Sequence, residues 1–154
     1  FLKGFKSSIK EFNKENIKVI FSGRKEPLSD KVWNTMKELE ASTKDCTRGT
    51  FNVCLNYGGQ AEVVDSAKKI ARLYKEGKIN LDENEYYHYL YNDLPPVDLM
   101  IRTSGEVRIS NFMLYSISYA ELVFTPVCFP DFTPEEFDKA LEDYEGRHIT
   151  KGKA

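Results

Sequence analysis

The sequence predicts an α/β fold in which a mostly parallel sheet carries helices on both faces. Short apolar segments of strand character alternate along the chain with longer segments of helical periodicity. Strands that alternate with helices pair in parallel, because each helix carries the chain back across the sheet. With 154 residues, of which 41% are hydrophobic, the chain is expected to form a single domain over residues 1–154.

Five elements are predicted in the first half of the chain. Apolar residues at helical spacing predict three helices: Phe1–Phe12, Leu28–Leu39 and Val63–Leu73. A short apolar run predicts a strand at Ile17–Phe21, and alternating apolar and polar residues predict another at Thr50–Leu55. The turn Asn56–Gly59 leads into the third helix, and Gly77 ends it.

The second half of the chain repeats this alternation. Helical periodicity predicts three helices: Asp82–Leu90, Asn111–Tyr119 and a last one that begins at Pro134. Ser110 and Thr133 are the expected N-cap residues of the latter two. Strands are predicted at Val97–Ile101, the most apolar and therefore the most buried, and at Leu122–Thr125. The polar tail from Gly146 is expected to be loosely ordered.

Composition excludes several classes of protein. The 22 basic and 24 acidic residues give a net charge of −2, so the chain lacks the basic surface of a nucleic-acid-binding protein. No apolar run reaches the ~18 residues that span a membrane. Three cysteines without metal-type spacing, Cys46, Cys54 and Cys128, are typical of reduced thiols in a cytosolic protein. The two histidines, His88 and His148, lie too far apart in the sequence to suggest a histidine-rich metal site.

The loop Arg102–Ser110 follows a predicted strand end, which is where ligands bind in parallel sheets. Arg102 and Arg108 can each grip a pair of anionic oxygens with a fork of N–H donors, and Glu106 can orient one of them. A helix beginning behind Ser110 adds free backbone N–H groups and a favourable dipole. These features suit a diphosphate. The residues alone fit equally well an exposed loop whose Arg–Glu pairs contribute little energy.

Glu121 is the candidate metal ligand. It precedes the apolar run Leu122–Phe124, where a carboxylate needs a cation or a hydrogen-bond donor as its partner. Mg²⁺ commonly combines one or two carboxylates with substrate phosphates, so Glu121 can complete a metal–diphosphate site. A purely structural ion pair with Arg102 or Arg108 explains the residue equally well.

The turn Asn56-Tyr57-Gly58-Gly59 also follows a predicted strand. Its glycines permit positive φ and a close approach of the backbone to a ligand. The turn lacks the GxGxxG spacing of dinucleotide-binding proteins, and turn formation alone explains its residues adequately.

Several blocks of this sequence resemble the signature of the cis-prenyltransferase family, in particular enzymes of the undecaprenyl diphosphate synthase, or isoprenyl transferase, type. The blocks are Arg102–Phe112, Tyr119–Leu122, Phe129–Phe132 and Asn56–Gly59 with Glu62-Val63. They are long and ordered, and the resemblance extends from the first helix to about Arg147.

The resemblance implies roles for individual residues. Four residues would bind the diphosphate of isopentenyl diphosphate: Arg102, Arg108, Ile109 and Ser110. Glu121 would belong to a Mg²⁺ site. Five residues would support the site: Asn56, Gly58, Gly59, Gly105 and Glu106. The implied reaction, part of isoprenoid biosynthesis, condenses isopentenyl diphosphate onto an allylic diphosphate such as farnesyl diphosphate and forms Z double bonds in a cell wall precursor lipid.

The resemblance further implies a cytoplasmic homodimer whose product is membrane-associated, with peripheral attachment to the membrane as an alternative. The sequence also departs from the family. The strand end Asp-Gly-Asn-Gly-Arg-Trp, which in the family holds the metal and the allylic diphosphate, does not occur here. We therefore assign no catalytic residue and expect the C-terminal portion of such an enzyme, with a sheet incomplete on its N-terminal side and no activity alone. Two alternatives stay open: a non-catalytic partner subunit of a prenyltransferase complex, and an unrelated α/β anion-binding module.

Overall fold

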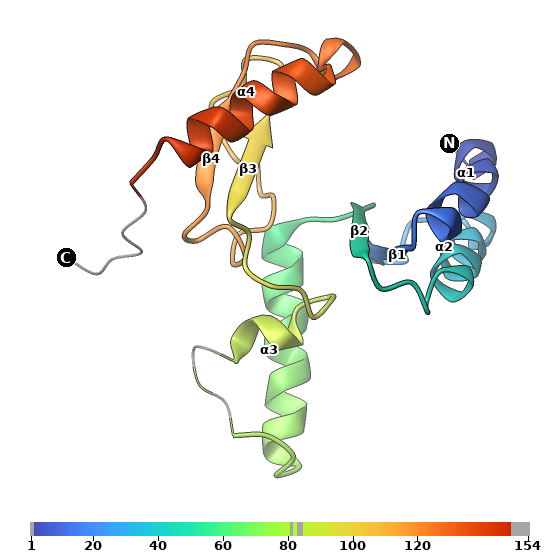
Figure 1. The fold of residues 1–154 in the computed structure, drawn as a ribbon. Helices are drawn as coiled ribbons and strands as arrows, with labels where there is room; N and C mark the ends of the chain where they lie inside the picture. Colours follow the sequence, from blue (N-terminus) through green and yellow to red (C-terminus); the bar gives the residue numbers. More distant parts are fainter. Residues whose placement is uncertain (1, 81, 83–84, 149–154) are drawn as a thin grey trace. The chain divides into compact units, whose positions relative to one another are not determined.

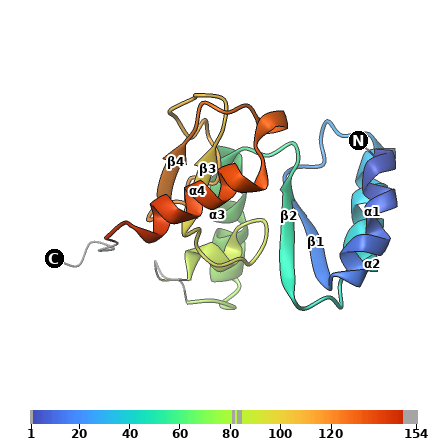
Figure 2. The ribbon, with the colours of Figure 1, turned by 45° about the horizontal axis from the view of Figure 1, so that its top comes forward.

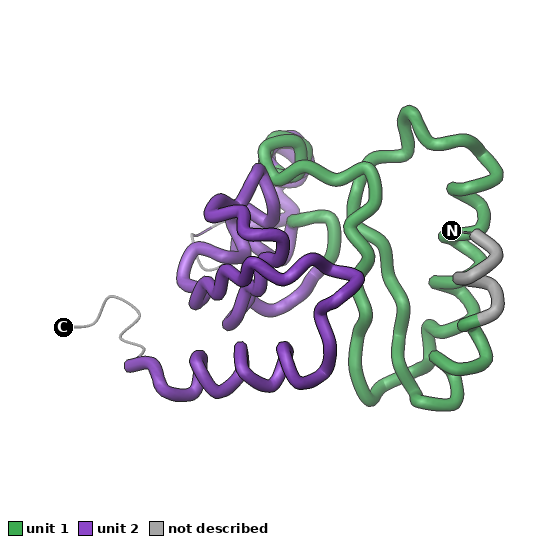
Figure 3. The backbone as a smooth tube through the Cα atoms, turned by 90° about the horizontal axis from the view of Figure 1, so that it is seen from above, with its two compact units in different colours: residues 1–66, 90–92 green, residues 67–89, 93–154 purple. Residues whose placement is uncertain are grey.

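The computed structural model (Figure 1) describes residues 2–80, 82 and 85–148, with the backbone alone described for residues 2–7. The chain divides into two compact units (Figure 3). The first unit is Phe1–Ser66 with Leu90–Asn92, and the second is Ala67–Tyr89 with Asp93–Ala154. Helix α3, Gly59–Lys75, contributes residues to both units. The expected single domain over residues 1–154 stays a prediction.

A strand–helix–strand crossover forms the centre of the first unit. Its elements are, in order, helix α1 (Leu2–Lys14), strand β1 (Ile17–Ser22), helix α2 (Asp30–Ser42), strand β2 (Gly49–Cys54) and the first turns of α3. The two strands pair in parallel, with Ile17 opposite Gly49 and Ser22 opposite Cys54. Helices α1 and α2 lie side by side, and both contact β1 (Figure 2).

The core of the first unit lies between β1 and α2. Alternate residues of β1 and residues three apart on α2 supply it, and the buried side chains are Val19, Phe21, Met36 and Leu39. Leu39 is 1% exposed and Val19 is fully buried. Each such side chain contributes about 1.5–3 kcal/mol through the removal of apolar surface from water.

Side chains close the outer edge of β1. The Val19 N–H donates to Thr43 Oγ1 and the Phe21 N–H donates to Glu40 Oε1, both at 3.0 Å. Asn92 Nδ2 donates to the Phe21 carbonyl at 3.0 Å. Because these bonds occupy the backbone groups that a further strand would need, β1 is protected against additional pairing.

The pairing of β2 with β1 continues to Leu55. The Leu55 N–H donates to the Ser22 carbonyl at 2.9 Å, so every second residue of β2 faces β1. The intervening residues, Thr50, Asn52 and Cys54, direct their backbone groups away from β1.

The second unit contains another parallel pair of strands. Its elements are, in order, the last turns of α3, the 3₁₀ helix η1 (Tyr86–Tyr89), strand β3 (Leu99–Arg102), strand β4 (Glu121–Phe124), the 3₁₀ helix η2 (Phe129–Asp131) and helix α4 (Pro134–Glu145). Leu99 lies opposite Glu121, and Arg102 lies opposite Phe124. Helix α4 packs against β4 (Figure 1).

The predicted fold class is confirmed, because the described strands pair in parallel and helices pack on both strand pairs, although residues 103–120 connect β3 to β4 through turns and irregular structure. The strands form two two-stranded ladders, β1-β2 and β3-β4. All four strands and helices α1 to α4 occur within a few residues of their predicted bounds. Thr133 is the N-cap residue of α4, although its side chain makes no capping hydrogen bond. The expected incompleteness of the sheet stays a prediction.

Two predicted helices are wrong. Residues 111–119 form turns, because Ser110, Asn111 and Met113 have φ values of 47°, 63° and 46°, which a right-handed helix does not admit. The segment predicted as Asp82–Leu90 contains only η1, and residues 83–84 of it lie outside the described residues. Of the tail, residues 149–154 likewise lie outside them.

Strand β3, which was predicted to be the most buried strand, is less buried than β1. β3 has one buried residue, Met100, whereas β1 has three. The reason is that two helices cover β1, whereas the residues expected to form a helix after β3 form turns. Phe112 and Tyr119, which their helical spacing assigns to the core, are accordingly 39% and 68% exposed.

The sequence also led to expectations about the cysteines and about membrane-spanning segments. Cys46, Cys54 and Cys128 are free thiols, as predicted. Among the described residues, no helix combines the length and apolar character that crossing a membrane requires.

Candidate functional site

The loop Arg102–Ser110, called the arginine loop below, starts at the last residue of β3. Arg102 Nη1 donates to the backbone carbonyl of Arg108, and the Arg108 guanidinium forms an ion pair with Glu106. The Arg108 side chain is 63% exposed. The structure therefore brings three of the predicted site residues together, with one arginine tied to the loop backbone and the other open to solvent.

The arginine loop is anchored to the chain that follows β4. The Ser104 N–H donates to the Val127 carbonyl at 2.8 Å, and the Gly105 N–H donates to the Thr125 carbonyl at 2.9 Å. Ser104 and Gly105 have φ values of 70° and 71°, a left-handed conformation that glycine adopts without strain. Gly105 thus allows the sharp turn between Arg102 and Arg108.

A four-residue turn ends the arginine loop. The Phe112 N–H donates to the Ile109 carbonyl at 3.0 Å, and the two residues between them, Ser110 and Asn111, are both left-handed. This turn stands where a helix N-terminus was predicted, so the expected helix dipole does not contribute to anion binding. The available donors are the two guanidinium groups and the exposed Ser110.

Glu121 lies at the other end of the β3–β4 ladder. It is the first residue of β4 and faces Leu99, whereas Arg102 faces Phe124, three residues further along. At about 3.3 Å per residue, this separates the two positions by about 10 Å along the strands. Within one chain, the structure does not bring Glu121 to the arginine loop.

The partner of Glu121 is Arg147. Arg147 Nη1 lies 2.8 Å from Glu121 Oε2, and Arg147 Nη2 lies 2.6 Å from Asp143 Oδ2. The structural ion pair predicted with Arg102 or Arg108 is therefore wrong. Sequence reasoning missed the role of Arg147, although its spacing of four residues from Asp143 on a helix signals a pair.

The described residues offer little to a metal ion by themselves. Among them, no group of three or more His, Cys, Asp or Glu side chains could hold a metal. Glu121 supplies one carboxylate, a hard oxygen donor that suits Mg²⁺, and diphosphate oxygens would have to supply other ligands. The donor chemistry fits a metal shared with a substrate and does not fit an independent metal centre.

The turn after β2 belongs to the first unit. Asn56 takes the left-handed conformation expected of the glycines, with φ 50°, and Gly59 begins α3. Asn56 Nδ2 donates to the Arg24 carbonyl at 2.8 Å and to the Glu26 carbonyl at 2.6 Å. The Gly58 carbonyl accepts the first of the helical bonds of α3. Asn56 therefore fixes the loop after β1 to the end of β2.

A polar network beside this turn was not predicted. Glu62, only 5% exposed, accepts hydrogen bonds from the Tyr57 hydroxyl and, at 3.2 Å, from the Tyr91 N–H. Asp65 binds Arg24 through two contacts of 2.8 Å and accepts from the Tyr91 hydroxyl at 2.7 Å. The resemblance block that contains Glu62 was the available signal, but its partner Tyr91 lies 29 residues away in the sequence.

Tyr91 predicts a pH dependence. Burial, together with its hydrogen bond to the Asp65 carboxylate, raises the pKa of Tyr91 to about 12 from 10.0. A folded-state pKa above the unfolded value means that this contribution to stability is complete below pH 10 and is lost as the pH rises towards 12. The free energy of unfolding should therefore fall more steeply over this range in the wild type than in Tyr91→Phe. Parallel slopes in urea denaturation would contradict the assignment.

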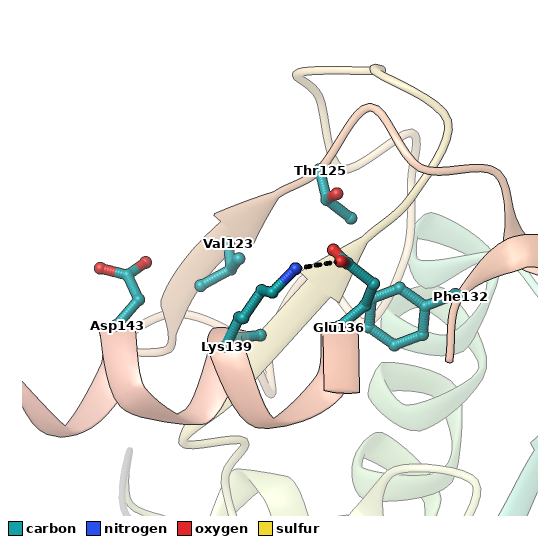
Figure 4. A pocket seen from close by; sticks show the side chains of 7 residues that line it. Val123, Thr125, Phe132, Glu136, Lys139 and Asp143 are labelled. Carbon is teal, nitrogen blue, oxygen red and sulfur yellow. Dashed lines mark hydrogen bonds and ion pairs between the residues drawn. The ribbon is translucent and has the colours of Figure 1, made fainter. Parts of the chain in front are cut away.

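A pocket in the second unit lies elsewhere. It has a volume of about 220 Å³ and is lined by seven residues: Val123, Thr125, Phe132, Glu136, Lys139, Ala140 and Asp143. Figure 4 shows Glu136 and Lys139 of α4 paired beside Thr125. None of the predicted site residues lines it, and it is smaller than the roughly 300–1,000 Å³ of most ligand sites.

The comparisons with known proteins cover nearly all of the chain. Residues 1–152 match the protein family described as "Putative undecaprenyl diphosphate synthase". An isoprenyl transferase of Fusobacterium nucleatum is 46% identical over 147 residues, which are 96% of this chain and 63% of that protein. A ditrans,polycis-undecaprenyl-diphosphate synthase of Legionella pneumophila, described as specific for (2E,6E)-farnesyl diphosphate, is 41% identical and covered to the same extents. The chain thus spans about three-fifths of the length of these relatives.

Solved structures give the same similarity. The crystal structure of a probable undecaprenyl diphosphate synthase from Campylobacter jejuni matches with a TM-score of 0.87 and 31% identity, over 98% of this chain and 70% of that one. A lavandulyl diphosphate synthase from Lavandula x intermedia, in complex with dimethylallyl diphosphate, matches with a TM-score of 0.88 and 29% identity, over 96% and 66% of the two chains.

Proposed function

The chain belongs to the undecaprenyl diphosphate synthase family, and we propose that its arginine loop binds the diphosphate of isopentenyl diphosphate. The observation that carries this proposal is the hydrogen bond from Arg102 to the Arg108 backbone carbonyl, which closes the loop that carries both arginines at the carboxyl end of β3. Ligands of parallel sheets bind at this end of the strands, and guanidinium forks match diphosphate oxygens. Ser110 adds a hydroxyl, and the Ile109 carbonyl closes the turn that presents it.

The proposed reaction is the condensation of isopentenyl diphosphate onto an allylic diphosphate, with a Z double bond in the product. Farnesyl diphosphate is the proposed allylic substrate, because the Legionella relative is described as specific for it. A bound Mg²⁺ would stabilise the negative charge that develops on the departing diphosphate. The arginine loop would hold the second substrate so that its alkene faces the allylic carbon, which removes much of the entropic barrier.

The chain is proposed to carry only the isopentenyl half of the site. Its sequence lacks the Asp-Gly-Asn-Gly-Arg-Trp segment that the resemblance assigns to the allylic half. We therefore expect no polyprenyl product when this polypeptide alone is supplied with both diphosphates and Mg²⁺. Chain-length analysis with labelled isopentenyl diphosphate tests this, and a product above background would contradict it.

A homodimer is part of the proposal. Glu121 lies about 10 Å along the ladder from Arg102, so one chain does not place this carboxylate at its own arginine loop. A second copy can supply it. A cytoplasmic location and a membrane-associated product stay predictions.

The two alternative functions are less well supported. A non-catalytic partner subunit does not need a loop that binds substrate. This chain has all three residues proposed to do so: Arg102, Arg108 and Ser110. An unrelated anion-binding module would share only the arginine loop, whereas the family match extends over residues 1–152.

The metal role of Glu121 predicts a specific loss. In the wild type, Mg²⁺ should tighten the binding of isopentenyl diphosphate. In Glu121→Gln this gain should shrink at least fivefold, about 1 kcal/mol, while metal-free binding stays within about twofold. Calorimetric titrations with and without Mg²⁺ measure the metal-free affinity and the gain that Mg²⁺ provides. The control is Glu142→Gln, because Glu142 is an exposed carboxylate on α4. An equal loss in both conditions would make Glu121 purely structural.

A further inference from the structure

Arg147 is fixed from three sides just beyond the end of α4. Its Nη1 donates to Glu121 Oε2 at 2.8 Å and to the Leu122 carbonyl at 3.1 Å. Its Nη2 donates to Asp143 Oδ2 at 2.6 Å. The side chains of Arg147 and Glu121 are 30% and 28% exposed, so both are largely withdrawn from water. One guanidinium thus joins the start of β4 to the last turn of α4.

In this arrangement the Arg147 guanidinium is the positively charged partner of Glu121. Arg147 contacts the carboxylate through one oxygen, Oε2, and its charge compensates that of Glu121 in this half-buried position. Arg147 also has a second anionic partner, Asp143, which lies four residues before it. If Glu121 were taken by another cation, the guanidinium would keep its pair with Asp143. The ion pair with Glu121 can therefore open without leaving the arginine charge uncompensated.

We propose that Arg147 occupies Glu121 as a displaceable counter-ion, which a divalent cation must replace before it can bind this carboxylate. The inference rests on the proposed metal role of Glu121. Arg147 acts through Glu121 and is a positioning residue. Its consequence is a coupling: a metal on Glu121 removes one of the two contacts of Arg147 with β4, and the tie between the last turn of α4 and the strand becomes weaker.

Mn²⁺ binding to the intact chain saturated with isopentenyl diphosphate tests the competition directly. Electron paramagnetic resonance of free Mn²⁺ measures it without any activity assay, against a blank that contains the diphosphate but no protein. Arg147→Gln should bind Mn²⁺ about tenfold more tightly than the wild type, which corresponds to about 1.4 kcal/mol. Arg147→Lys keeps the charge and should stay within about threefold of the wild type. Glu121→Gln should weaken binding, and Arg147→Gln should then no longer tighten it in the double variant.

Lys139→Gln is the matched control. It removes the same charge from α4, the helix that precedes Arg147, but Lys139 pairs with Glu136 in the pocket of Figure 4 and not with Glu121. Its Mn²⁺ affinity should stay within about twofold of the wild type. Circular dichroism establishes that each variant is folded. If Lys139→Gln tightened binding as much as Arg147→Gln, a general charge effect would replace the proposed competition.

The outcomes separate this inference from the proposed function. Binding that weakens in Glu121→Gln but is unchanged in Arg147→Gln overturns the counter-ion role and leaves the metal role of Glu121 intact. Binding that is unaffected by Glu121→Gln overturns both roles. Failure of the arginine loop to bind isopentenyl diphosphate would be a separate result, measured without metal.

Amide exchange supplies a second readout. With isopentenyl diphosphate present, Mg²⁺ should accelerate exchange at Gly146 and Arg147, whose N–H groups donate to the Glu142 and Tyr144 carbonyls at 3.1 Å and 3.2 Å. Glu121→Gln should abolish this Mg²⁺ response, because the metal no longer has a ligand there. Exchange that is insensitive to Mg²⁺ in the wild type would overturn the coupling.

Discussion

Replacement of Arg102 by Gln is expected to weaken the binding of isopentenyl diphosphate by about 2–3 kcal/mol, roughly 30- to 150-fold. The substitution removes a charged fork of donors and also the tie to the Arg108 carbonyl that holds the loop closed. Arg108→Gln should have a smaller effect, about 1–2 kcal/mol, because its side chain is 63% exposed and solvent screens its charge. Isothermal titration calorimetry without metal measures both losses.

Two variants make this experiment specific. Arg72→Gln removes the same charge from the exposed side of α3 and should leave the affinity within about twofold. Arg102→Lys keeps the charge but not the planar fork, so it should recover only part of the affinity. Unchanged binding in both Arg102→Gln and Arg108→Gln would favour the partner-subunit alternative over the proposed function.

The buried Glu62 predicts the largest loss of stability. Glu62→Ala should lower the free energy of unfolding by about 2–4 kcal/mol, because it leaves the Tyr57 hydroxyl and the Tyr91 N–H without their acceptor and opens a cavity. Glu62→Gln keeps one oxygen acceptor and should lose about half as much. Urea denaturation followed by fluorescence of Trp33, the single tryptophan of the chain, reports on the first unit.

The control for this prediction is Glu11→Ala, an exposed carboxylate on α1 of the same unit. It should change the free energy of unfolding by less than about 0.5 kcal/mol. A similarly small change in Glu62→Ala would show that the hydrogen bonds of this carboxylate do not support the turn after β2.

Much of the fold was predictable because local patterns express it. The apolar run of β1 and the spacing of Met36 and Leu39 on α2 follow directly from which faces are buried. The arginine loop could likewise be recognised, because its chemistry lies in adjacent residues. Arg102 and Arg108 are six residues apart, and their contact needs only a loop that turns back on itself.

Residues 111–119 show where local patterns fail. Phe112, Tyr115 and Tyr119 have helical spacing, but the segment follows two left-handed residues and is drawn toward β3 by a bond from the Val97 N–H to the Ser116 carbonyl, 2.9 Å long. Tyr115 packs on Tyr86, with ring centroids 4.6 Å apart. Contacts with distant residues therefore outweighed the weak preference of this segment for a helix.

The order of strands and helices, and the residue types able to grip a diphosphate, could be read from the amino-acid chain, because each depends on near neighbours. The identity of the cation that meets Glu121 could not. Arg147 is 26 residues away, and only the packing of α4 against β4 brings its guanidinium to that carboxylate. Periodicity reports which face of an element is buried, whereas the pairing of charges depends on distances that exist only once the elements have packed.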